Sequence, residues 1–246
     1  MIALDIHTTV GELVKDRPAR SRVFENLGID YCCGGKRSLA EACGAQGLDV
    51  AEVLNRLETH DARAESEETG LADVNGMGLG ELADHIERTH HAYLREELPR
   101  LGIMVRKVAA VHGDRYPWMP EIDTIFAAFT AELQSHMLKE EQILFPLIRA
   151  LERGEAGQGH ACGGGIAAPI SVMEHEHANA GDALALMREL SSGFTPPADA
   201  CNTFCAMLDG LAQLERDMHE HVHKENNILF PSALALDSAC AGKDLM

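Results

Sequence analysis

Two stretches of the chain repeat one eleven-residue pattern of chemically active and apolar residues. One reads HMLKEEQILFP from His136 and the other reads HVHKENNILFP from His221, with seven identical positions. In each copy a glutamate follows the histidine by four residues, Glu140 in the first and Glu225 in the second. On an α-helix such a pair projects from one face. An imidazole beside a carboxylate can form an ion pair or bind a metal ion.

The apolar residues after each pair lie partly on the same helix face, which places the pair at the edge of a buried stripe. A single pair of this kind is usually a surface ion pair or a hydrogen-bonded core histidine. Two copies at matched positions favour a metal site, because burying ionised groups is costly unless they are paired or bind a metal. A four-helix bundle can hold such a site at its centre, with ligands supplied by the facing helices.

Two further stretches, ADHIERTHHAYLREELPRL and ISVMEHEHANAGDAL, offer more histidines. The first contains His90 and His91, and the second contains His175 and His177. His91 precedes the first copy of the repeat by 45 residues, and His177 precedes the second by 44. Periodicity alone does not choose between His90 and His91. Each half of the chain thus supplies one histidine and one His-x-x-x-Glu pair, which makes four histidines and two carboxylates.

Nitrogen and carboxylate ligands suit iron, manganese or zinc, and the lack of cysteine in the set argues against a soft metal. A structural zinc site would use four ligands, commonly with thiolates among them. Six ligands, two of them carboxylates that can bridge, indicate two ions. Two irons joined by Glu140 and Glu225 are the simplest interpretation.

A competing motif overlaps the second copy. Residues 219–223 read HEHVH and match H-E-x-x-H, the helix signature of zinc metalloproteases, with Glu220 as the base. The repeat argues against it, because the first copy has Gln134 and Leu138 where the second has His219 and His223. We expect His219 and His223 to face solvent or to lie beside the ligands.

The elements that would position these residues are helical. Ala, Leu, Glu and Met outweigh Val, Ile and Thr, and aromatic residues make up only 4%. The sequence predicts an all-α protein with a small helical domain over 1–60, a linker over 61–80, and a four-helix bundle over 81–238. The four long amphipathic segments are 81–111, 119–152, 170–191 and 198–236.

Composition also excludes some classes of function. The net charge of −18 argues against a nucleic-acid partner and against an anionic membrane surface. No apolar run approaches the roughly twenty residues of a membrane span, and no export signal is visible. Seven cysteines at irregular spacing argue against a disulfide framework. We therefore expect a cytoplasmic protein.

The N-terminal segment carries two adjacent cysteines, Cys32 and Cys33. They lie between Gly28, which should close a helix, and Ser38, which should open another with a capping box. A helix N-terminus and nearby cations lower the pKa of a thiol, so we expect thiolate character in one or both. Adjacent cysteines can also close into an easily reduced disulfide. The alternative is two inert thiols in a packed turn.

The ligand pattern in a four-helix bundle resembles hemerythrin-like domains, and GIDYCCGGKRSLAEAC resembles the short domain that precedes the bundle in the repair-of-iron-centres (RIC) family. REELPRL, QSHMLKEEQILFP, ISVMEHEH, TPPADAC and ENNILFP fit the same family, so the resemblance covers nearly the whole chain. It implies redox chemistry or iron transfer for Cys32 and Cys33, and it leaves open whether His90 or His175 assists. The ligands it implies are His91, His136, His177 and His221 as terminal ligands, and Glu140 and Glu225 as bridges.

Members of the RIC family are cytoplasmic di-iron proteins that restore iron–sulfur clusters damaged by nitric oxide or peroxide. The resemblance implies two non-haem iron ions with oxo and carboxylate bridges, and it implies damaged iron–sulfur proteins and nitric oxide as partners. Repair by iron donation and repair by enzymatic nitric oxide reduction both remain open, and so does a homodimer. The alternative is a hemerythrin-type protein that binds or senses oxygen or iron.

Overall fold

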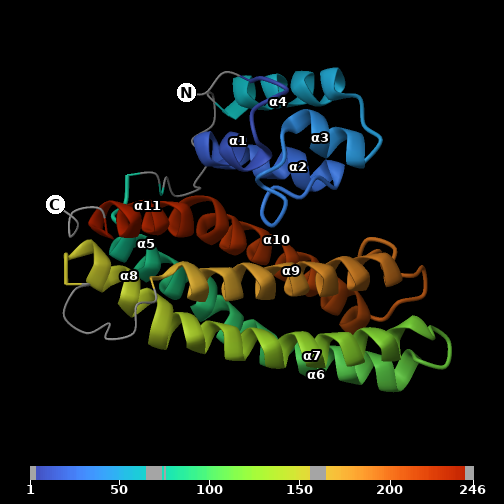
Figure 1. The fold of residues 1–246 in the computed structure, drawn as a ribbon. Coiled ribbons are helices and arrows are strands. Elements are labelled where there is room, and N and C mark those ends of the chain that lie inside the picture. The colour runs from blue at the N-terminus through green and yellow to red at the C-terminus, as the bar shows by residue number, and fades with distance from the viewer. Residues whose placement is uncertain (1–3, 65–73, 75, 156–164, 242–246) are drawn as a thin grey trace. The chain divides into compact units, whose positions relative to one another are not determined.

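The structure is a computed structural model in which the regular elements are helices (Figure 1). Among the described residues, the only β feature is one isolated bridge between Thr9 and Ser38. The prediction of an all-α protein is therefore confirmed. The structure describes residues 4–64, 74, 76–155 and 165–241.

The N-terminal helices are short, as the sequence predicts, and their ends follow local capping chemistry. Ser38 and Glu41 form the predicted capping box, and Gly28 ends a helix with the left-handed φ of 66° that glycine tolerates. The elements are α1 (Val10–Asp16), η1 (Pro18–Arg20), α2 (Ser21–Leu27), α3 (Leu39–Ala45) and α4 (Val50–Ala64). The helix α4 thus runs four residues into the expected linker, and residues 65–73 and 75 of that linker lie outside the described part.

The long helices follow the predicted segments closely, although three of them contain a short π-helical stretch. The last segment begins at Asn202 rather than at residue 198, because its first residues stay in the proline-containing turn. The elements are α5 (Leu79–Ile86), η2 (Glu87–His91), α6 (Ala92–His112), α7 (Trp118–Lys139), η3 (Glu140–Leu144), α8 (Phe145–Glu152), α9 (Ala167–Leu190), α10 (Asn202–Lys224), η4 (Glu225–Leu229) and α11 (Phe230–Ala241).

Each π-helical stretch widens the helix by one residue per turn. The Phe145 N–H donates to the Glu140 carbonyl, and the Phe230 N–H donates to the Glu225 carbonyl, five residues back in both cases. The proline after each phenylalanine has no N–H to donate, so it needs no carbonyl partner in the turn where the α-helix resumes. The repeated ILFP sequence therefore forms the same widened turn twice.

By internal contacts the chain divides into two compact units, residues 83–218 and residues 1–82 together with 219–246. In the first unit α6 packs on α7, and α7 packs on α9 (Figure 1). Arg188 of α9 donates to Glu215 of α10 at 2.8 Å. His90 of η2 lies 2.8 Å from Asp217 of α10, which closes the ring of four helices.

The core of the 83–218 unit consists of apolar side chains spaced three or four residues apart on each helix, as an amphipathic helix requires. Leu98 and Leu101 on α6 are buried, as are Phe126 and Phe129 on α7. This core fixes the four helices around the polar side chains described below. The buried apolar residues that the other two helices contribute to this unit include Ile170, Met173, Leu184, Met187, Phe204, Met207, Leu208, Leu211, Leu214 and Met218.

In the other unit, a buried arginine joins three N-terminal elements. Arg20 in η1 is only 1% exposed. Its guanidinium donates to the Leu13 carbonyl at 3.0 Å, to Asp16 at 3.2 Å and to Asp61 of α4 at 2.6 Å. Each of these bonds gives a guanidinium N–H group an acceptor, which offsets the free energy lost when that group is buried away from water. In the same unit α1 also contacts η4.

No helix among the described residues combines the length and the apolar composition that crossing a membrane requires.

Candidate metal centre

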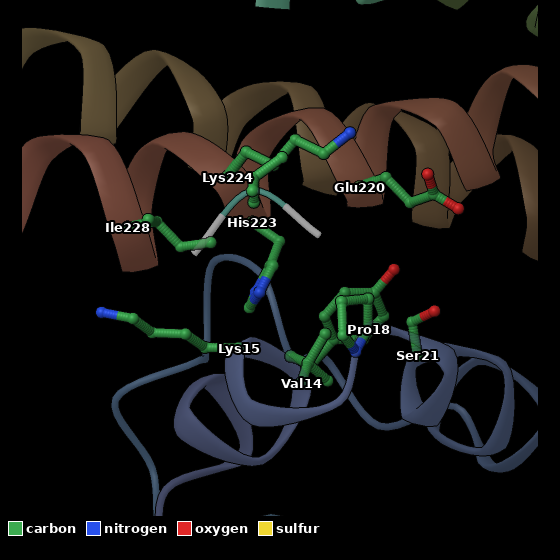
Figure 2. A pocket seen from close by; sticks show the side chains of 10 residues that line it. Val14, Lys15, Pro18, Ser21, Glu220, His223, Lys224 and Ile228 are labelled. Atoms are coloured by element: carbon green, nitrogen blue, oxygen red, sulfur yellow. The ribbon is translucent and has the colours of Figure 1, made fainter. Parts of the chain in front are cut away.

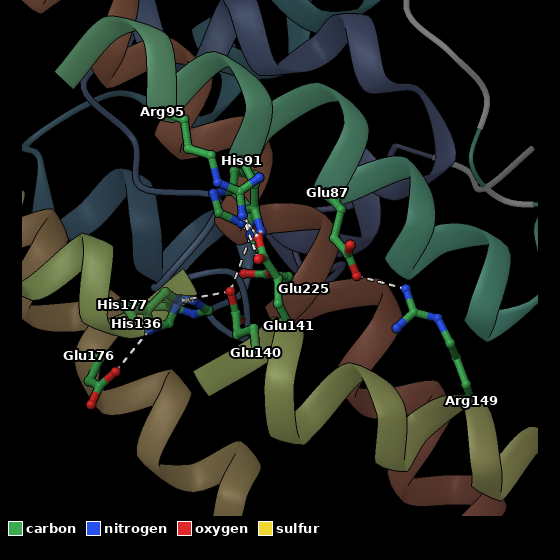
Figure 3. A network of polar contacts seen from close by, with 11 residues as sticks. Glu87, His91, Arg95, His136, Glu140, Glu141, Arg149, Glu176, His177 and Glu225 are labelled. Atoms are coloured by element: carbon green, nitrogen blue, oxygen red, sulfur yellow. Dashed lines mark hydrogen bonds and ion pairs between the residues drawn. The ribbon is translucent and has the colours of Figure 1, made fainter. Parts of the chain in front are cut away.

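Four of the six predicted ligands come together within the 83–218 unit (Figure 3). The Oε2 atom of Glu140 lies 3.3 Å from Nε2 of His91 and 3.3 Å from Nε2 of His136. The Nε2 atom of His177 lies 3.1 Å from Nε2 of His136. Three helical segments distant in sequence thus direct imidazole nitrogens toward one carboxylate.

The other two predicted ligands lie one turn apart where α10 passes into η4. The Nε2 atom of His221 lies 3.1 Å from Oε1 of Glu225. Both side chains are buried, so this pair repeats the one that His136 and Glu140 form in the other unit. Within the 83–218 unit, ligand atoms of His136, Glu140 and His177 lie within 4.8 Å of one another, close enough to hold a metal ion.

All six side chains are buried, and the carboxylates of Glu140 and Glu225 are fully so. A carboxylate loses its hydration when it is buried, and a bound cation offsets this cost. The donor set contains imidazole nitrogens and carboxylate oxygens but no sulfur, which suits iron better than a soft metal. The residues present therefore fit a metal site.

The second ring nitrogen of two histidines is held by a carboxylate. Nδ1 of His91 lies 2.6 Å from Glu141, which also pairs with Arg95. Nδ1 of His136 lies 2.9 Å from Glu176, which also pairs with Lys139. Such partners fix the orientation of a ligating histidine and increase its basicity.

The neighbouring histidines are placed differently. His90 is buried, but its Nδ1 lies 2.8 Å from Asp217. His175 is exposed and lines a cavity of about 430 Å³ that also reaches His136 and His177. The structure thus places His91 rather than His90 beside Glu140, and His177 rather than His175 beside His136.

The H-E-x-x-H motif does not form a metal group among the described residues. His223 is buried, so of the two expected placements it does not face solvent. Its ring lies 5.5 Å from the ring of Tyr31, and its Nδ1 lies 3.3 Å from the Asn227 amide nitrogen. Burial lowers the pKa of His223 to about 4, against a hydrogen bond with the Tyr31 backbone that raises it. The imidazole is therefore neutral at pH 7.

The two adjacent cysteines form a compact turn around Asp30. Their sulfur atoms lie 3.9 Å apart and are not joined in a disulfide. The Oδ1 atom of Asp30 accepts the N–H groups of Cys32 at 3.0 Å and Cys33 at 2.9 Å, and the Cys32 thiol at 3.2 Å. Cys32, Cys33 and Asp30 also lie close enough together to hold a metal ion.

The environment of Cys32 differs from the sequence expectation. The hydrogen bond that its thiol donates to Cys33 raises its pKa well above the usual value, and burial and the charge of Asp30 raise it further. The expected thiolate character is therefore wrong for Cys32. The basic residues nearby in sequence would lower the pKa of this thiol, but the sulfur and carboxylate acceptors beside it and its burial have the larger effect.

The π-helical turns were not predicted from the sequence, although they contain three of the six ligands. His91 ends η2, Glu140 begins η3 and Glu225 begins η4. Helical stretches of this kind are rare and occur often at functional sites. The signal that marks two of them is the proline that follows Glu-x-x-x-x-Phe in both copies.

A four-helix bundle that gathers histidines and glutamates at its centre defines a hemerythrin-like protein. In agreement, a family model described as the hemerythrin HHE cation binding domain matches residues 82–233. A second model, ScdA_N, described as a domain of unknown function, matches residues 6–61.

Curated relatives match almost the whole chain. The iron–sulfur cluster repair protein YtfE of Musicola paradisiaca is 40% identical over 226 residues, which cover 92% of this chain and 96% of that protein. The YtfE proteins of Pectobacterium atrosepticum and Escherichia coli O157:H7 are each 41% identical, with the same coverage. The chain belongs to this family of YtfE-type proteins with a C-terminal hemerythrin domain. The resemblance noted from the sequence is therefore confirmed.

Proposed function

We propose that this protein repairs iron–sulfur clusters damaged by nitric oxide or oxidative stress, using two iron ions held by the six buried ligands. The observation that carries the proposal is that the buried pair His136–Glu140, with His91 and His177 beside it, has a buried counterpart in His221–Glu225. Two carboxylates can bridge two ions, whereas a single ion would leave part of the set of six ligands unused. The relatives that match nearly the full length are named for the same repair.

In this proposal the four histidines are terminal ligands and the two glutamates are bridges, with an oxo group as a third bridge. Bound iron supplies one-electron chemistry for nitric oxide reduction, and in repair by iron donation the iron is the cargo. Glu141 and Glu176 hold the Nδ1 protons of His91 and His136, so that each Nε2 lone pair faces the site. Arg95 and Lys139 pair with those two carboxylates and hold them in place.

The cavity beside His136 and His177 supports exchange with solvent. It is about 430 Å³ in volume and is lined on one side by Lys139 and Glu176. Nitric oxide is small enough to enter such a space, and a cation leaving the site would meet the Glu176 carboxylate. Access of this kind suits repair more than the closed, dry pocket that oxygen carriage needs.

We further propose that Cys32 and Cys33 take part in redox chemistry or in iron transfer. Their sulfur atoms are 3.9 Å apart, and Cys33 is partly exposed, so one thiol can meet a partner while the other stays buried. A cytoplasmic location fits the lack of disulfides among the cysteines in the described part of the chain.

A reconstitution experiment tests the proposal. The protein loaded with isotopically labelled iron is mixed with an iron–sulfur protein whose cluster nitric oxide has damaged. We expect the cluster to be restored and to contain the label, and we expect His136→Ala to abolish the effect. The matched control is Glu189→Ala, which removes an exposed acid from α9. A protein that carries iron but neither donates it nor consumes nitric oxide would contradict the proposal.

A further inference from the structure

The two copies of the repeated motif diverge on one helix face. Leu138 and Gln142 in the first copy correspond to His223 and Asn227 in the second, and the members of each pair are four residues apart. In the first copy this face is open, since Leu138 is 51% exposed and Gln142 is exposed. In the second copy His223 is only 5% exposed and Asn227 is half-buried.

The second copy is covered by the turn that leads into the two cysteines. The Asn227 side-chain amide donates to the Cys32 carbonyl at 3.1 Å and lies 3.5 Å from the Tyr31 carbonyl. His223 points from α10 toward α1 beside it (Figure 2). Its ring meets the ring of Tyr31 edge-on at 5.5 Å. The polar replacements in the second copy thus make the contacts that hold this turn.

Two glycines leave the space that the Asn227 side chain fills. The Gly11 N–H donates to the Gly35 carbonyl at 2.9 Å, which brings α1 against the cysteine turn. A Cβ atom added to Gly11 would lie 2.5 Å from Oδ1 of Asn227, and one added to Gly35 would overlap the same atom. Because real Cβ contacts are never so short, the carboxamide occupies a cradle that only glycine permits at both positions.

Asn227 is also close to the metal site along the chain. It follows Glu225 by two residues within η4, the widened turn in which the Phe230 N–H reaches back to the Glu225 carbonyl. A displacement of η4 must therefore move Asn227 in its cradle or carry the cysteine turn with it. Without a cation, the fully buried carboxylate of Glu225 lacks the charge partner that offsets its desolvation, which favours such a displacement.

We propose that Asn227 is a positioning residue that couples the Cys32–Cys33 turn to Glu225, so that filling the metal site keeps the Cys32 thiol covered. This inference rests on the metal site proposed above. Whether the turn covers the Cys32 thiol then depends on whether iron is bound. Coupling between two sites is reciprocal, so a modified Cys32 would in turn weaken the binding of iron.

The experiment measures alkylation of Cys32 in the full-length protein, with mass spectrometry of the modified peptide, before and after a ferrous-iron chelator removes the metal. In the unmodified sequence we expect iron removal to speed alkylation about tenfold, the factor that one or two lost hydrogen bonds provide. Asn227→Ala should react at the fast rate with and without iron. The matched control is Gln142→Ala, the corresponding position of the first copy, which should behave like the unmodified sequence.

Asn227→Asp provides a second variant in case Asn227→Ala does not fold, because it keeps the size and Oδ1 but removes the N–H donors. It should also lose the dependence on iron, while circular dichroism stays unchanged. An iron-dependent rate that survives in both variants, or a rate that is the same with and without iron in the unmodified sequence, would overturn the inference. A protein that binds no iron at all would instead overturn the function proposed above.

Discussion

Glu140 places its Oε2 atom 3.3 Å from Nε2 of His136, four residues earlier in the sequence, and both side chains are buried. The second copy of the motif repeats the relationship, with 3.1 Å between His221 and Glu225. A buried ion pair of this kind seldom adds stability, because the cost of desolvation rivals the attraction. Two such buried pairs, at matched positions of a repeated motif, are better explained by the metal ions that they would hold.

Removing the carboxylate behind His136 should weaken the metal site without destroying it. Glu176→Gln leaves all six ligands in place but replaces the charge that orients Nδ1 of His136. We expect the affinity for ferrous iron to fall about ten- to a hundredfold, the usual effect of losing such a partner. Competition with a chelator of known affinity measures it. Glu189→Gln, on the exposed face of the same helix, is the control and should leave the affinity unchanged.

The N-terminal elements should depend on Arg20. Arg20→Ala leaves Asp16 and Asp61 without their shared cation and the Leu13 carbonyl without a donor. We expect the free energy of unfolding of this part to fall by about 3–5 kcal/mol, as for other broken buried pairs. Proteolysis or denaturant unfolding followed in the N-terminal region checks it. Arg56→Ala, which breaks an exposed pair with Glu52, should have little effect, and equal losses in the two variants would contradict this role.

Stability should decrease at alkaline pH because of Cys32. The pKa of its thiol is raised in the folded protein, so folding keeps a proton that the unfolded chain loses above its ordinary pKa near 9. The stabilisation is complete below that pH and is lost as the pH rises toward the folded pKa. The slope is at most about 1.4 kcal/mol per pH unit. Urea unfolding at pH 7 and pH 10 measures it, and Cys32→Ala should show a shallower decline. Parallel declines in the two proteins would refute the assignment.

Much of the fold and the site was predictable because both rest on local rules. Helical periodicity and turn-forming residues placed the long helices within a few residues of their observed ends. The duplication singled out His136, Glu140, His221 and Glu225, since chance does not repeat an eleven-residue pattern. The choice of His91 over His90 came from the family resemblance instead.

The remaining features depend on contacts between distant segments. The π-helical turns arise from the balance between proline chemistry and packing, which helical periodicity does not reveal. The burial of His223 and the cradle around Asn227 require Tyr31, Gly11 and Gly35 to meet η4. The raised pKa of Cys32 likewise comes from its depth and from Asp30, whereas its sequence neighbours Lys36 and Arg37 suggested the opposite sign. The spacing of residues along one helix can be read from the sequence, but the desolvation of a side chain by distant segments cannot.

The central claim, that Glu140 and Glu225 bridge two irons, is tested most directly by metal analysis of the purified protein together with its absorption spectrum. The account predicts about two irons per chain with near-ultraviolet oxo-bridge absorption. It predicts that Glu140→Ala and Glu225→Ala each lose most of both signals, while Glu121→Ala, at an exposed position of the helix that leads to Glu140, retains them. A protein that instead holds one zinc ion, and keeps it after both substitutions, would contradict the account.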